Sequence, residues 1–326
     1  MEQPWFFVIL MAVMYYGYIF ASGTKVGKEL MQECIVSYPK HPKVLVGILV
    51  IFYLWYAVLA GGLHFPTTLK TCLYLLIPAV LLWHTRKKMW VITHWDWLVI
   101  VALWVPFDLR LLGRRPEAIK DALDWPITAV SAVIIGVMFW VHVRCIEGTK
   151  LEFSFWGRDF FCRLKDIGLA LAGFLVLGFV LIPFGMLIGF LHPRDFVTEG
   201  LKQGLPLWSI VWDNLTTTKY LVYFAKILVT IALSEEFLFR SIIQNFLEQT
   251  TNRPTRALII TSLLFGAAHF NNGAKGIMPM DWNWPYFYMA TIAGLAYGLT
   301  FRLGTSIVAS MLLHTLVDAT WHTFFK

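Results

Sequence analysis

Apolar blocks close to twenty residues long recur along the 326-residue chain and constrain its fold more than any other feature. A helix needs ~20 apolar residues to cross a bilayer. The chain is 58% hydrophobic and 14% charged, whereas soluble domains are roughly 45–50% apolar and 25% charged. In lipid only helices and closed barrels satisfy the backbone, and barrel strands are alternating segments of ~10 residues. We therefore predict an all-α, polytopic transmembrane helical bundle.

The blocks predict about 8–10 membrane spans. The block 67–83 contains Lys70 and Pro78, and the block 96–109 is short. Either block could therefore cross the membrane, re-enter it or lie flat. In chain order the predicted spans are 4–22, 44–63, 67–83, 96–109, 126–143, 167–191, 220–247, 256–270, 284–302 and 305–325.

Two domains are predicted, because the unusual polar residues lie in the last third of the chain. Residues 1–165 form an N-terminal transmembrane extension of unknown role, and residues 166–326 form the core that carries the candidate site. The extension ends in segment 148–166, whose apolar face and basic face suit a helix lying on the membrane surface. Segment 192–219 is predicted to be a loop or a lid over the site, or an ordinary connector.

The net charge of +7 raises the question of nucleic-acid binding. Lysine and arginine gather in the short loops between apolar blocks, which is typical of the positive-inside bias of membrane proteins. No basic patch with nucleic-acid spacing is present in the sequence. We expect a lipid bilayer and no nucleic acid as partner, and a multi-pass protein of the plasma (inner) membrane of a prokaryote.

Two adjacent carboxylates, Glu235 and Glu236, lie inside the apolar block 220–247. A charged side chain at the bilayer centre costs ~2.5 kcal/mol or more. Arg240 follows Glu236 by one helical turn, so the two can pair. Glu235 is rotated by ~100° from Glu236 and can point to another helix. We predict that Glu236 and Arg240 are supporting residues and that Glu235 is catalytic. The alternative is one buried salt-bridge network that locks helices together.

Two histidines and an aspartate occur in later apolar blocks. His269 follows Gly266, Ala267 and Ala268, small residues that allow close helix packing. His314 and Asp318 are four residues apart, on one face of the block 305–325. A carboxylate beside an imidazole can fix its tautomer, and the same spacing suits metal ligation.

Other catalytic motifs are poorly matched. The sequence contains no His-Glu-x-x-His zinc-protease pattern and no glycine-rich nucleotide loop. Gly304-Thr305-Ser306 is similar to the start of a rhomboid-type serine motif, but Ile307 stands where a glycine would follow. A serine nucleophile is therefore weakly supported.

The polar residues resemble the motifs of the CPBP family of intramembrane endopeptidases, also called the Abi or CAAX-protease family. The family pattern is Glu-Glu-x-x-x-Arg, then Phe-x-x-x-His, then His-x-x-x-Asn or Asp, each on a separate membrane helix. The chain departs from it in Ser241, where the family often has glycine. The matching residues are Glu235, Glu236 and Arg240, then Phe265 and His269, then His314 and Asp318.

The resemblance implies a peptidase that cuts a membrane-anchored protein or peptide near its anchored, C-terminal end. Glu235 would take a proton from water, His269 would help to hold that water, and His314, aligned by Asp318, would stabilise the oxyanion. We expect no cofactor. The open alternative is zinc held by Glu235, His269 and His314.

Two other function classes remain open from the sequence. Buried glutamate, histidine and aspartate also suit a proton- or ion-coupled transporter, although no internal repeat of the kind that favours one is visible. A catalytically inactive binding or immunity protein of the same fold would carry the same residues.

Overall fold

The computed structural model describes residues 29–30, 33, 65–85, 92–109, 160–212, 214–272 and 282–326. The chain divides into two compact units, Met1–Ser154 and Phe155–Lys326. Every regular element in the described part is helical, which confirms the all-α class. The predicted spans 4–22, 44–63 and 126–143 lie outside the described residues, as does most of segment 148–166.

The first unit contains two described helices that pack against each other, α4 (Phe65–Thr85) and α5 (His94–Asp108). The Tyr74 hydroxyl of α4 donates a buried hydrogen bond of 2.7 Å to the Leu103 carbonyl of α5. Asp96 accepts hydrogen bonds from the backbone N–H and the hydroxyl of Thr93 at the start of α5. Such side-chain acceptors satisfy N–H groups that a helix start leaves free. Helix α4 extends two residues beyond its predicted block at each end, whereas α5 begins two residues before its block and ends one residue short of it.

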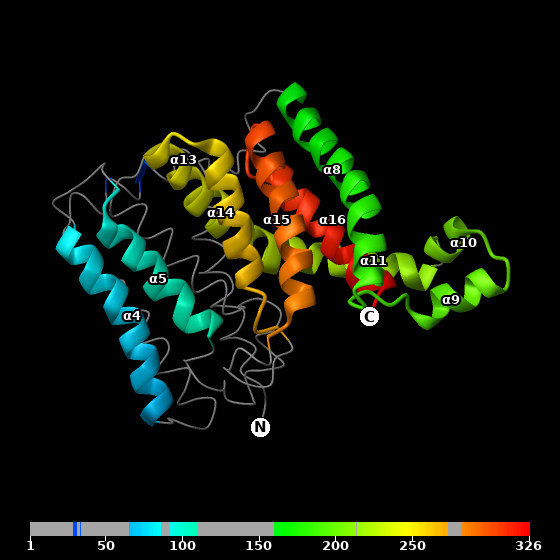
Figure 1. Cartoon of the computed structure of the whole chain (residues 1–326), viewed down its shortest axis with the longest axis horizontal. Helices are drawn as coiled ribbons and strands as arrows, with labels where there is room; N and C mark the ends of the chain where they lie inside the picture. The colour runs from blue at the N-terminus through cyan, green and yellow to red at the C-terminus, as the bar shows by residue number, and fades with distance from the viewer. Residues whose placement is uncertain are drawn as a thin grey trace. The chain divides into compact units, whose positions relative to one another are not determined.

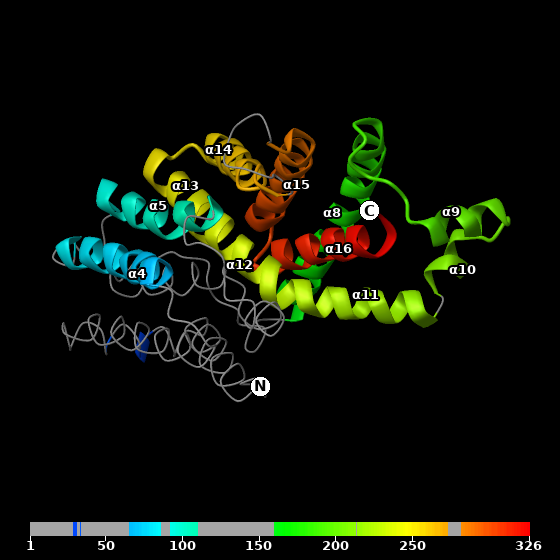
Figure 2. The same cartoon turned by 90° about the horizontal axis from the view of Figure 1, so that it is seen from below.

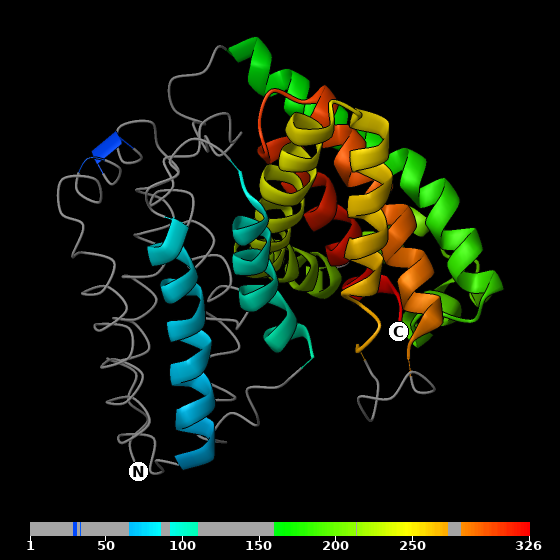
Figure 3. The same ribbon diagram turned by 60° about the vertical axis from the view of Figure 1, so that its left-hand side comes forward.

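The second unit holds the candidate site. Helix α14 packs against α15, and α16 packs against α8, α11 and α15 (Figures 1 and 3). In chain order its elements are α8 (Phe160–Leu187), α9 (Asp195–Lys202), α10 (Leu207–Val211), α11 (Asn214–Ile227), the π-helical segment η1 (Leu228–Ala232), α12 (Leu233–Glu236), the π-helical segment η2 (Phe237–Gln244), α13 (Asn245–Thr251), α14 (Pro254–Ala267), α15 (Trp284–Leu303) and α16 (Val308–Phe324).

The predicted span 220–247 lies within a continuous helical stretch from α11 to α13, but that stretch is not one regular α-helix. The two π-helical segments flank the four-residue α12 on both sides. π-Helical turns are rare and are frequent at functional sites. Figure 2 shows α11 lying beside α16, so the stretch is held against the last helix of the chain.

Helix α8 carries the membrane-span signature of the described part. Its residues Cys162–Leu187 are long and apolar enough to cross a bilayer, and only 17% of its most apolar window is buried within the protein. Pro254–Ala267 of α14 is apolar but shorter. The charged residues Glu235, Glu236 and Arg240 interrupt the stretch from α11 to α13. The polytopic bundle therefore remains a prediction.

Asp166 of α8 fixes the loop that leads into α16. Its buried carboxylate accepts hydrogen bonds from the Thr305 backbone N–H (2.7 Å), the Thr305 hydroxyl (2.9 Å) and the Ser306 hydroxyl (2.6 Å). The Ser306 hydroxyl thus donates to the buried Asp166 carboxylate, as a structural serine does. Helix α8 runs through the predicted domain boundary at 165/166, and the compact unit begins at Phe155.

Candidate active site

Glu236 and Arg240 form a completely buried ion pair. Glu236 ends α12 and Arg240 lies in η2, and both side chains have 0% exposure. The Arg240 Nε–H donates to Glu236 Oε2 at 3.1 Å. The one-turn spacing of the sequence therefore does bring the two groups together, although the helix between them is π-helical.

Two aromatic rings lie against the Arg240 guanidinium. Its carbon Cζ lies 5.0 Å from the centroid of the Phe265 ring and 6.0 Å from that of Tyr297. Nη1 and Nη2 have no hydrogen-bond partner among the residues that the structure describes. A cation over an aromatic face is stabilised electrostatically, and more so when it is desolvated. The ion pair and the two rings therefore hold the segment that carries the two glutamates.

His314 of α16 faces a carboxylate at each of its ring nitrogens. Nδ1 lies 2.9 Å from Glu236 Oε1, and Nε2 lies 3.4 Å from Asp318 Oδ2. An imidazole that donates from both nitrogens carries a positive charge. Glu236, predicted only as a partner of Arg240, thus also holds His314 in place.

His269 lies just beyond the C-terminus of α14, where a backbone carbonyl fixes its ring. Its Nδ1 is 2.7 Å from the Phe265 carbonyl oxygen, one turn earlier. Because Nδ1–H donates to that carbonyl, Nε2 of the neutral ring is an acceptor. Nε2 is the nitrogen that faces Glu235.

Glu235 lies between the two histidines. Its Oε2 is 4.0 Å from His269 Nε2 and 3.9 Å from His314 Nε2. That oxygen is shielded from solvent and accepts no hydrogen bond from any described residue. Two groups that each hydrogen-bond one water at about 2.8 Å lie roughly 4–4.6 Å apart. The three residues therefore converge at a distance that one water molecule can span.

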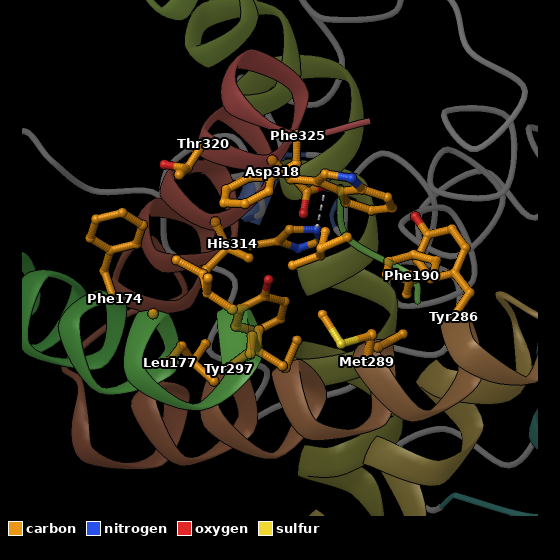
Figure 4. Close-up of a pocket in the computed structure, with 18 of the residues that line it drawn as sticks. Phe174, Leu177, Phe190, Tyr286, Met289, Tyr297, His314, Asp318, Thr320 and Phe325 are labelled. Carbon is orange, nitrogen blue, oxygen red and sulfur yellow. Dashed lines mark ion pairs between the residues drawn. The ribbon is translucent and has the colours of Figure 1, made fainter. Parts of the chain in front are cut away.

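A cavity of about 100 Å³ adjoins the two histidines and Asp318. Most of its wall comes from α8, α15 and α16, and Phe265 of α14 also contributes; the wall is mostly apolar. In Figure 4, Phe174 and Leu177 of α8 lie on the left, and His314 and Asp318 of α16 lie near the centre. Tyr297 of α15 lies below His314, and Met289 of α15 lies to the right of Tyr297. The cavity lining includes His269, His314 and Asp318, so polar groups of the site form part of its wall.

Two tyrosines of α15 border the site and were not predicted. Tyr297 stacks on His314, with ring centroids 4.6 Å apart and an interplanar angle of 17°. The Tyr286 ring lies 4.7 Å from that of His269. Tyrosine is common in apolar helices near a membrane surface. Nothing in the sequence therefore distinguishes these two from other aromatic residues of the chain.

The donor geometry differs from that of a zinc site. Two ligands at about 2.0–2.1 Å from a tetrahedral zinc ion lie roughly 3.3 Å apart. The Glu235 Oε2 to histidine Nε2 distances of 4.0 and 3.9 Å are longer. No group of three histidine, cysteine, aspartate or glutamate side chains in the described part is arranged to hold a metal ion. These two separations exceed the spacing of two ligands on one zinc ion and can each be spanned by one water molecule.

Comparison with known protein families gives a match in the C-terminal third of the chain. Residues 217–320 match the family described as Rce1-like, type II CAAX prenyl endopeptidase Rce1-like. The match spans all three motifs from Glu235 to Asp318 and confirms the resemblance to CAAX proteases. No curated protein and no solved structure gives a significant match.

Proposed function

Because residues 217–320 match the Rce1-like family of CAAX proteases, we propose that the chain is an intramembrane endopeptidase that uses a glutamate-activated water. It hydrolyses a peptide bond near the membrane-anchored, C-terminal end of a protein or peptide. The observation that carries this proposal is the position of Glu235 Oε2, one water molecule away from both His269 and His314. Peptidase activity is the activity of the family, and the catalytic residues are our assignment.

In the proposed reaction Glu235 is the general base. A water between the three side chains donates one hydrogen to Glu235 Oε2 and the other to His269 Nε2. As the water oxygen bonds to the peptide carbonyl carbon, Glu235 takes the proton. The carbonyl oxygen becomes negative and replaces Asp318 as the acceptor of the His314 Nε2–H hydrogen bond, so that His314 acts as an oxyanion donor. The C–N bond then breaks, and the leaving amine takes the proton from Glu235.

The supporting residues hold these groups in place. Glu236 binds Arg240 with one carboxylate oxygen and His314 with the other. Through Glu236 the helix that carries the base is thus joined to the helix that carries the oxyanion donor. Asp318 faces Nε2 of His314 from one turn further along α16 and favours its charged form.

Membrane-anchored peptides test the function. The purified protein is reconstituted into vesicles with a library of peptides that carry a C-terminal lipid or transmembrane anchor, and products are read by mass spectrometry. We expect cleavage at defined bonds near the anchor. Uptake of peptide without cleavage would instead indicate a transporter, and binding with neither would indicate an inactive relative.

Zinc content distinguishes a glutamate peptidase from a zinc metallopeptidase. We propose that no metal takes part, and we therefore expect the active protein to contain far less than one zinc per chain. Chelators such as 1,10-phenanthroline should leave the cleavage rate unchanged. Stoichiometric zinc, lost together with activity on chelation and restored with it, would assign Glu235, His269 and His314 as metal ligands instead.

A further inference from the structure

The cavity beside the histidines is apolar along most of its wall and has the size of a small binding pocket. Its volume is about 100 Å³. A dry apolar cavity of about 150 Å³ is large enough for benzene. The volume therefore suits one aliphatic side chain, and the position beside His269 and His314 is where the substrate residue next to the cleaved bond would lie.

Gly178 of α8 lines this cavity and differs from two other glycines of the same helix. A Cβ atom at Gly173 would lie 2.9 Å from Leu313 Cδ2, and one at Gly185 would lie 2.7 Å from Leu191 Cδ1. Those two glycines are needed because neighbouring side chains pack against the α8 backbone. A Cβ at Gly178 would meet nothing within 4 Å. The missing side chain at Gly178 therefore adds free space to the cavity.

We infer that the cavity binds one apolar side chain of the substrate, adjacent to the cleaved bond, and that Gly178 determines the largest side chain accepted. This inference rests on the proposed endopeptidase function. Burying an apolar side chain stabilises the bound state, so substrates that fill the cavity are cleaved faster than substrates that leave it unfilled. A side chain introduced at Gly178 would occupy the same space.

The test compares matched leucine substitutions on one helix. Gly168 of α8 also has nothing within 4 Å of an added Cβ, but it is exposed and does not line the cavity. Wild type, Gly178→Leu and Gly168→Leu are assayed on anchored peptides whose residues flanking the cleaved bond are alanine, valine, leucine or phenylalanine. The readout is kcat/KM for each peptide, with the unfolding midpoint of each variant measured in parallel.

Wild type and Gly168→Leu are expected to prefer valine or leucine to alanine at one flanking position by about 10–200-fold, the usual range for apolar pockets. Gly178→Leu should lose most of that preference, because cleavage of the leucine peptide falls much more than cleavage of the alanine peptide. Gly178→Ala should give a smaller shift in the same direction. It adds only one methyl group, so it keeps the test decisive if the leucine variant unfolds.

Three outcomes have different meanings. If both Gly178 variants keep the wild-type order of kcat/KM among the peptides, the side-chain pocket is overturned and the endopeptidase proposal stays intact. If both Gly178 variants lose kcat/KM equally for all peptides, the side-chain pocket is also overturned, because the cavity would then hold the lipid anchor or part of the main chain. If the wild type cleaves none of the peptides, the proposed function itself fails, and this inference fails with it.

Discussion

Replacing Glu235 with glutamine is expected to lower kcat for anchored-peptide cleavage by about 10²–10⁴-fold, the contribution typical of a general base. Glutamine keeps the shape and hydrogen-bonding reach of the side chain but cannot take a proton from water. The fold should be retained, because Glu235 Oε2 accepts no hydrogen bond from the residues that the structure describes. Cleavage is measured with protein in vesicles, and folding by circular dichroism and the unfolding midpoint.

Glu199 provides the matched control for this variant. It is a glutamate of α9 that has no part in the site. Glu199→Gln should therefore cleave at the wild-type rate. If folded Glu235→Gln also cleaves at that rate, Glu235 is not the base.

Removing the guanidinium of Arg240 is expected to destabilise the folded protein by about 3–5 kcal/mol, the usual cost of removing one partner of a buried ion pair, because Glu236 would keep only His314 as a partner. In Arg240→Ala, Glu236 Oε2 loses its 3.1 Å partner while remaining completely buried. The rings of Phe265 and Tyr297 also lose the cation that they contact. Thermal unfolding in mild detergent or bicelles measures the loss.

Two further substitutions make this result specific. Arg240→Lys keeps the charge but not the planar guanidinium. Its unfolding midpoint should therefore lie between those of wild type and Arg240→Ala. Arg256→Ala removes an exposed arginine from α14 and should barely change the unfolding midpoint. An Arg240→Ala protein that unfolds at the wild-type temperature would show that the pair does not stabilise the fold.

The helices were largely predictable because apolar blocks mark them directly. The blocks 284–302 and 305–325 correspond closely to α15 and α16. Helix α8 begins seven residues before its predicted start, at Phe160 rather than 167, because basic residues in its first turns interrupt the apolar pattern there. The π-helical segments around α12 were missed, since they depend on how the backbone hydrogen bonds shift and not on residue type.

The polar residues of the site were predictable because charged groups are conspicuous in apolar surroundings. Which of these residues contact each other was only partly predictable. Spacing within one helix indicated the contact of Glu236 with Arg240, whereas the 2.9 Å contact of Glu236 with His314 joins residues 78 positions apart. That contact depends on how α12 and α16 approach each other, which no local pattern records. The same holds for Tyr297 against His314.

The most direct test of the site is the coupling between Glu235 and His269 in one kinetic cycle. Groups that act on the same water lose their effect together, so their substitutions are not additive. We predict that Glu235→Gln combined with His269→Ala cleaves anchored peptide within about tenfold of the slower single variant. If the two losses multiply instead, the glutamate and the histidine act independently, and a shared catalytic water is contradicted.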